Sequence, residues 1–174
     1  MKLLFISLGC DKNLVDSEEM LGMLAADGHE IVDDEDEAEV IIVNTCCFIG
    51  DAKEESVNTI LEMAEKKKAG TCKVLIVTGC MAQRYKKEIS EEIPEVDAIL
   101  GTTSYGDISK AVKEAQAGRH FEEYKSIDFL PDISGKRMLT TGGHFAYLKI
   151  AEGCDKHCTY CCLLYTSPSP RDCS

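Results

Sequence analysis

The chain has 174 residues, which is room for one full α/β domain and little more. Its formal net charge of −12 favours basic partners and argues against bare nucleic acid or an anionic membrane as a partner. No run approaches the ~20 apolar residues of a membrane span. The ten cysteines accompany alternating strand and helix patterns with no export signal, so we expect a cytoplasmic protein that uses cysteine for metal or redox chemistry.

Short runs rich in aliphatic and β-branched residues alternate with helical patterns along the first two thirds of the chain. This alternation is typical of buried parallel strands joined by crossover helices. The expected strands are residues 2–8, 30–33, 40–44, 74–78 and 98–101, and the expected helices are residues 14–26, 52–69, 82–92 and 107–117.

Two of these helices carry specific expectations. Asn13 is a plausible N-cap of the first helix, and Gly28 is expected to end it. In the second helix, an i, i+3, i+4, i+7 stripe predicts the buried face. The stripe consists of Val57, Ile60, Leu61 and Ala64.

A cysteine follows the first, third and fourth strands, at Cys10, Cys46 and Cys80. In a flavodoxin-like strand order, 2-1-3-4-5, these three strands are neighbours, whereas the Rossmann order 3-2-1-4-5 spreads them apart. Ligands of open α/β sheets bind at the carboxyl ends of the strands. We therefore predict a flavodoxin-like parallel sheet of about five strands, with helices on both faces and a three-thiol metal site at its carboxyl edge.

The domain organisation changes after the expected sheet. We assign residues 1–118 to the α/β domain and residues 119–143, which have weak periodicity, to a linker. Residues 144–161 begin a second unit, with a strand candidate at 145–150 followed by a cysteine loop. Residues 162–174 are rich in Ser and Pro and have no period, so we interpret them as a disordered or non-native tail of a truncated reading frame.

The loop Cys154-Asp155-Lys156-His157-Cys158-Thr159-Tyr160-Cys161 is a CxxxCxxC motif. Three thiolates on one loop can hold three corners of an iron–sulfur cube and leave the fourth iron open. Zinc is the alternative, and it would need a fourth ligand such as His157. The remaining cysteines Cys47 and Cys72 are interpreted as packing residues, and Cys162 and Cys173 of the tail are not expected to be ligands.

The CxxxCxxC loop resembles that of the radical S-adenosylmethionine enzymes. Together with Ser7–Glu18, Asn44–Phe48 and Thr78–Tyr85, it resembles the methylthiotransferase family of those enzymes. The resemblance implies that Cys154, Cys158 and Cys161 hold the radical-generating 4Fe-4S cluster. It also implies that Cys10, Cys46 and Cys80 hold an auxiliary 4Fe-4S cluster, and that Tyr160 contacts bound S-adenosylmethionine.

Within that family, Asp11-Lys12-Asn13 after the first cysteine resembles the members that methylthiolate an aspartate β-carbon in a small-subunit ribosomal protein. The tRNA-modifying members typically have Gln-Met-Asn there and are the first alternative. The expected partners are therefore a ribosomal protein and a reducing electron donor, with no membrane and no direct nucleic acid contact. Because we expect the chain to be truncated, two further alternatives stay open: a non-catalytic iron–sulfur module and a zinc-stabilised structural module. The truncation also predicts that this chain alone has no enzymatic activity.

Overall fold

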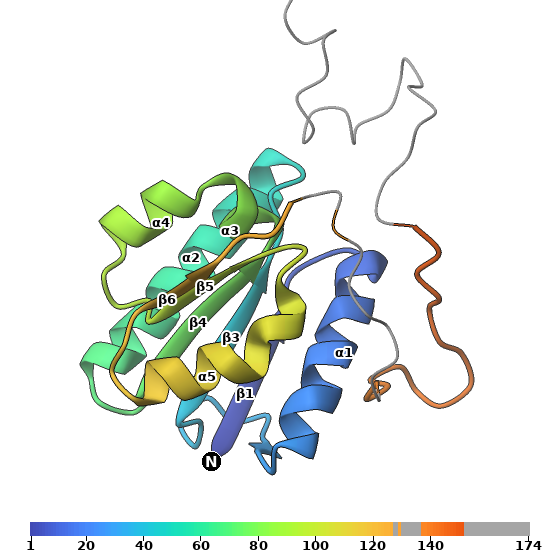
Figure 1. Cartoon of the computed structure of the whole chain (residues 1–174), viewed down its shortest axis with the longest axis horizontal. Helices are drawn as coiled ribbons and strands as arrows, with labels where there is room; N and C mark the ends of the chain where they lie inside the picture. The colour runs from blue at the N-terminus through green and yellow to red at the C-terminus, as the bar shows by residue number, and fades with distance from the viewer. Residues whose placement is uncertain (127–128, 130–136, 152–174) are drawn as a thin grey trace, which may run out of the picture.

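The computed structural model describes residues 1–126, 129 and 137–151. Its strands and helices alternate along the first 123 residues (Figure 1). The strands are β1 (Lys2–Ser7), β2 (Glu30–Ile31), β3 (Val40–Thr45), β4 (Val74–Gly79), β5 (Ala98–Gly101) and β6 (Phe121–Glu123). The helices are α1 (Asp11–Ala26), α2 (Gly50–Lys68), α3 (Cys80–Arg84), α4 (Lys86–Glu92), the short 3-10 helix η1 (Tyr105–Asp107) and α5 (Ile108–Gln116).

The six strands form one sheet in the order β2-β1-β3-β4-β5-β6, and every neighbouring pair is parallel. The expected flavodoxin-like order is confirmed, and β1, β3 and β4 are direct neighbours. The sheet is one strand wider than expected, because Phe121 pairs with Ala98 at its edge. This sixth strand falls inside residues 119–143, which the sequence had indicated as a linker.

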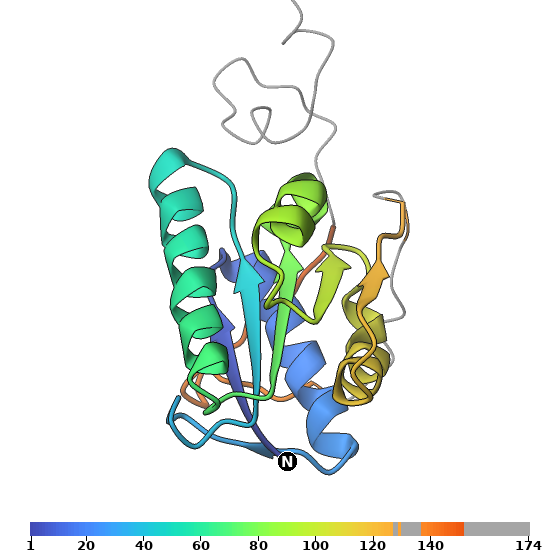
Figure 2. The same ribbon diagram turned by 90° about the vertical axis from the view of Figure 1, so that its left-hand side faces the viewer.

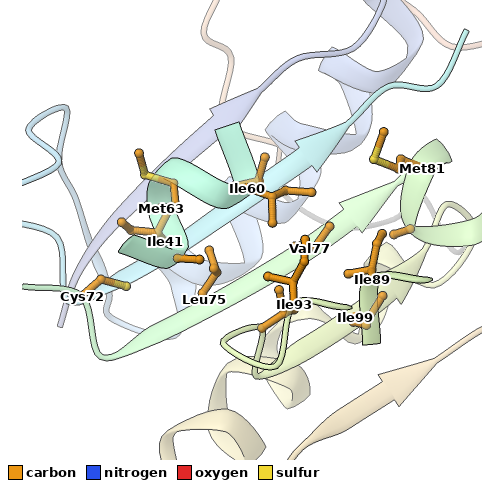
Figure 3. Packing of buried hydrophobic residues seen from close by; sticks show 14 of the residues in the cluster. Ile41, Ile60, Met63, Cys72, Leu75, Val77, Met81, Ile89, Ile93 and Ile99 are labelled. Atoms are coloured by element: carbon orange, nitrogen blue, oxygen red, sulfur yellow. The ribbon is translucent and has the colours of Figure 1, made fainter. Parts of the chain in front are cut away.

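Helices cover both faces of the sheet (Figures 1 and 2). Helices α1 and α5 lie on one face, and α2, α3 and α4 lie on the other. The β3 and β4 strands are fully buried between the two layers, which explains why their sequences are continuous apolar runs. Figure 3 shows the core under α2 and α4, where Ile41, Leu75 and Val77 of the sheet meet Ile60 of α2 and Ile89 of α4.

The buried face of α2 is rotated from the expected one. Ile60 and Ala64 are buried, but Val57 and Leu61 are 40% and 46% exposed. Ser56 takes the inner position instead, where its hydroxyl donates to the Cys46 carbonyl (2.9 Å) and accepts from the Cys46 amide (3.1 Å). This polar contact with the end of β3 sets the rotation of the helix.

Two expected helix boundaries are also wrong. Helix α1 begins at Asp11 with Cys10 as its N-cap, because the Leu14 amide donates to the Cys10 carbonyl (2.9 Å). Asn13 is therefore inside the helix and is not its cap. The helix expected at 82–92 is divided at Tyr85 into α3 and α4.

Residues 145–150 do not form the strand that their sequence predicts. An extended segment becomes a strand by pairing with a neighbour, and this segment pairs with no strand in the described part of the chain. It is instead held to α1 by a contact between the Lys149 and Asp16 side chains. Among the described residues, no helix has the length and apolar character needed to cross a lipid bilayer.

Candidate metal centre at the carboxyl edge of the sheet

The strand register places the first three predicted cysteines at one edge of the sheet. Thr45 of β3 pairs with Gly79 of β4, so Cys46 and Cys80 each follow the last paired residue of adjacent strands. Neighbouring strands are ~4.8 Å apart. Cys10 follows the neighbouring strand β1 and is the N-cap of α1. The three cysteines therefore leave the sheet from three consecutive strands, as the sequence predicted; their role as ligands stays a prediction.

Electrostatic coupling supports this proximity. Burial, with smaller contributions from negative charge on Cys47, Cys46 and Cys10, raises the pKa of the Cys80 thiol to about 11, although a hydrogen bond with Thr102 acts to lower it. Cys80 and Cys46 are partly buried and Cys10 is exposed. A site of mutually repelling thiolates gains most from a bound cation, because the cation reverses the sign of the local field and keeps the thiols deprotonated.

A network of buried polar side chains supports the cysteine edge from below. The Asn13 side-chain amide donates to the Thr45 backbone carbonyl (3.1 Å). The Asn13 side-chain oxygen accepts from the Cys80 thiol (3.9 Å). The Asn44 side-chain amide donates to the Ser17 hydroxyl (2.9 Å) and to the Asn13 backbone carbonyl (3.2 Å). The Ser7 and Ser17 hydroxyls are 2.9 Å apart. These contacts connect β1, β3 and α1 directly beneath the thiols.

Gly79 permits the close approach of β4 to β3 at this edge. Its φ is +96°, a conformation that residues with a side chain rarely adopt. A Cβ at this position would meet the Asn44 side chain and would lie 2.5 Å from the Thr45 carbonyl oxygen. The glycine before Cys80 is therefore required by the geometry that sets Cys80 beside Cys46.

Three thiols are a soft donor set of the kind that an iron–sulfur cluster takes. A tetrahedral ion with bonds of ~2.3 Å needs its sulfurs within ~4 Å of one another. No group of three Cys, His, Asp or Glu side chains among residues 1–126, 129 and 137–151 is arranged to hold one metal ion. In an iron–sulfur cube each cysteine binds a different iron, so the sulfurs stand further apart. Three thiols at one edge match three corners of such a cube.

The two cysteines interpreted as packing residues are buried, as predicted. Cys47 is 5% exposed, and Cys72 is 2% exposed in the core beneath α2. The Cys72 thiol donates to the Val74 carbonyl (3.0 Å). Burial raises the pKa of both thiols above their ordinary values. Both therefore behave as small apolar residues.

The second cysteine set lies outside the described residues. Cys154, Cys158, Cys161 and Tyr160 consequently stay predictions. The segment that leads to them, residues 137–151, contacts α1 through two buried carboxylates that the sequence reasoning missed, Asp16 and Glu18. The sequence signal for this contact was a pair of acidic residues on the otherwise buried face of a helix. That signal could not identify the basic partners, because they lie more than a hundred residues away in the sequence.

A flavodoxin-like parallel sheet covered by helices on both faces, with three cysteines at its carboxyl edge, defines the class of this protein as an α/β domain of the flavodoxin-like kind. The chain belongs to a family known as Uncharacterized protein family UPF0004, whose family model matches residues 2–101.

Among curated proteins, the chain is similar to the ribosomal protein uS12 methylthiotransferase RimO of several bacteria. It is 63% identical over 161 residues to RimO of Lachnoclostridium phytofermentans and 50% identical over 161 residues to that of Clostridioides difficile. It is 51% identical over 170 residues to that of Acetivibrio thermocellus. Each match covers 92% of this chain but only 36–37% of the relative, so the chain spans little more than a third of these proteins.

Proposed function

We propose that this chain supplies the cysteine ligands of two 4Fe-4S clusters to a radical S-adenosylmethionine methylthiotransferase. The observation that carries the proposal is the delivery of Cys10, Cys46 and Cys80 to one sheet edge by three neighbouring parallel strands. The similarity to RimO proteins over 92% of the chain supports the enzyme family.

In this proposal Cys10, Cys46 and Cys80 hold the auxiliary cluster, and Cys154, Cys158 and Cys161 hold the other. When bound, the clusters supply the sulfur and the reductive cleavage of S-adenosylmethionine that methylthio transfer requires. Tyr160 contacts the S-adenosylmethionine. The contribution of the described residues is positional: Asn13 and Asn44 connect α1 to β3 beneath the thiols, and Ser56 binds both backbone polar groups of Cys46.

The proposed substrate is an aspartate of a small-subunit ribosomal protein. The named activity of the relatives and the Asp11-Lys12-Asn13 sequence after Cys10 support it. A net charge of −12 also suits a basic ribosomal protein better than tRNA. A ribosomal substrate and an external electron donor both imply that the protein acts in the cytoplasm.

Anaerobic reconstitution of the 174-residue chain with iron and sulfide tests the ligand assignment. We expect about eight iron atoms per chain, which is two cubes of four. Cys46→Ala and Cys80→Ala should each reduce the iron content to about four, whereas the matched controls Cys47→Ala and Cys72→Ala should leave it unchanged. Stoichiometric zinc without iron would instead support the zinc-stabilised module.

A chimeric enzyme tests the substrate assignment. Residues 1–161 of this chain would replace the matching segment of the Lachnoclostridium phytofermentans relative, to which they are 63% identical. We expect this chimera to add a methylthio group to uS12, detected by mass spectrometry, and its Cys46→Ala variant to add none. Cluster formation without cleavage of S-adenosylmethionine by the chimera would favour a non-catalytic iron–sulfur module. Methylthiolation of tRNA in place of uS12 would favour the tRNA alternative.

A further inference from the structure

Two carboxylates of α1, Asp16 and Glu18, are buried although they lie near the start of a surface helix. Asp16 is 3% exposed and Glu18 is 0% exposed. Buried carboxylates are costly unless paired and hydrogen-bonded. Both carboxylates form ion pairs with residues 137–149: Glu18 with Arg137 and Asp16 with Lys149.

Every oxygen of the Glu18 side chain is used to hold that segment. One oxygen accepts from the Thr140 amide (2.6 Å) and the Thr140 hydroxyl (2.8 Å). The other accepts from the Arg137 Nε (2.6 Å) and forms a second contact with the guanidinium. The Glu18 backbone carbonyl accepts from the Met138 amide (2.9 Å).

The Asp16 carboxylate makes the second attachment, an ion pair with Lys149 whose side chains are 4% and 8% exposed. The Lys149 ammonium also lies 5.1 Å from the ring centroid of Tyr105, where a cation is attracted by the face of the ring. We refer to the contacts of Asp16 and Glu18 with residues 137–149 as the α1 anchor.

The α1 anchor is close along the chain to Cys10 on one side and to Cys154 on the other. Cys10 is the N-cap of α1, so Asp16 is six residues, or ~9 Å of helix, from it. A shallow hollow beside the first turn of α1 is lined by Asp11 and Lys12 on one side and by residues 147–151 on the other. Cys154 is three positions after Ala151, a span of at most ~11 Å of extended chain.

We propose that Asp16 and Glu18 are positioning residues that hold residues 137–149 on α1 and thereby fix where the chain enters the second cysteine set relative to Cys10. The inference rests on the proposed function only for the identity of the two clusters. Residues 137–149 have no strand partner in the described part of the chain. The contacts with Asp16 and Glu18 therefore hold this segment in place, as strand pairing would do in a sheet. The helix that carries the first cysteine thus also sets the start of the second cysteine loop.

Hydrogen–deuterium exchange on the cluster-free 174-residue chain tests the anchor itself. Glu18→Gln and Asp16→Asn keep the shape of each side chain and remove its charge. We expect the Met138 and Thr140 amides to exchange at least about tenfold faster in Glu18→Gln, since the free energy of local opening sets the exchange rate. Glu62→Gln, at an exposed site on α2, is the matched control and should leave both rates unchanged. Unchanged rates in Glu18→Gln would overturn the proposal.

The magnetic interaction between the two reduced clusters tests positioning. We expect Asp16→Asn and Glu18→Gln to bind the wild-type amount of iron but to change the spin–spin splitting in electron paramagnetic resonance spectra. Faster exchange with an unchanged splitting would show that the anchor only stabilises the fold, and would refute the positioning role. If no cluster forms in the wild type, the proposed function fails while the exchange result still decides the anchor.

Discussion

Replacement of Gly79 by alanine is the most direct test of how the sheet edge is built. Gly79 has a φ of +96° and a ψ of −160°, a region that is essentially restricted to glycine. Its added methyl group would also lie 2.5 Å from the Thr45 carbonyl oxygen, which is backbone and cannot rotate away. Relief requires β4 to move from β3 at the point where Cys46 and Cys80 leave the sheet.

The expected loss of stability has two parts. Holding an alanine in this backbone region costs roughly 1–3 kcal/mol. Overpacking against a neighbouring strand costs roughly a further 1–3 kcal/mol. We therefore expect the free energy of unfolding to fall by about 4 kcal/mol. Gly118 provides the matched control, because its φ is also positive (+71°) but an added Cβ would meet nothing within 4 Å. Gly118→Ala should cost about 1–2 kcal/mol.

Urea unfolding of the cluster-free chain, followed by circular dichroism, measures both variants. With a slope of about 2 kcal/mol per molar urea, Gly79→Ala should lower the midpoint by about 2 M and Gly118→Ala by under ~1 M. Failure of Gly79→Ala to fold while Gly118→Ala folds agrees with the same reasoning. Equal losses in the two variants would refute it, since the close approach to Thr45 would then add nothing to the cost of a positive φ.

Three further predictions follow from burial and charge. Ile60→Ala should lower the free energy of unfolding by roughly 2–5 kcal/mol, whereas Leu61→Ala should change it by under ~1 kcal/mol. Comparable large drops of the urea midpoint in both variants would instead support the apolar stripe expected from the sequence. Because burial raises the pKa of Cys47, iodoacetamide at pH 8 should alkylate it far more slowly than the exposed Cys10. Peptide mass spectrometry measures both rates, and comparable rates would mean that Cys47 is not packed in the core. Burial alone would raise the pKa of Glu18, but hydrogen bonds from Thr140 and Arg137 lower it below 4.5. The stability difference between wild type and Glu18→Gln should therefore be constant above about pH 5 and close as the pH falls through the folded-state pKa; a gap that widens in acid would contradict the assignment.

The strand pattern was predictable because it depends on local composition. The β1, β3 and β4 strands are continuous apolar runs, and their bounds lie within one residue of the predicted ones. The strand order followed from requiring the three cysteines to meet. The β6 strand was missed because an edge strand of three residues, Phe-Glu-Glu, has only one apolar side chain to mark it.

The polar contacts at the site were not predictable, because their partners are distant in sequence. Ser56 occupies the inner face of α2 only because the end of β3 offers it the amide and carbonyl of Cys46. Asn13 was expected to cap the first helix, and the structure instead places its side-chain amide between β3 and the Cys80 sulfur. Glu18 pairs with residues about 120 positions away. A periodic pattern records which side of a helix is apolar, but not which polar residue has a partner.

Helix α1 explains why one short segment carries so many polar residues in a buried place. Asn13 and Ser17, one helical turn apart, face β3 and join the network beneath the thiols. Asp16 and Glu18 face the segment 137–149. An apolar residue at any of the four would bury more area but would leave a backbone carbonyl or a cation without its partner, at a cost that burial alone does not offset. The polar sequence of α1 is therefore what a helix requires when it has to contact both the cysteine edge of the sheet and the segment 137–149.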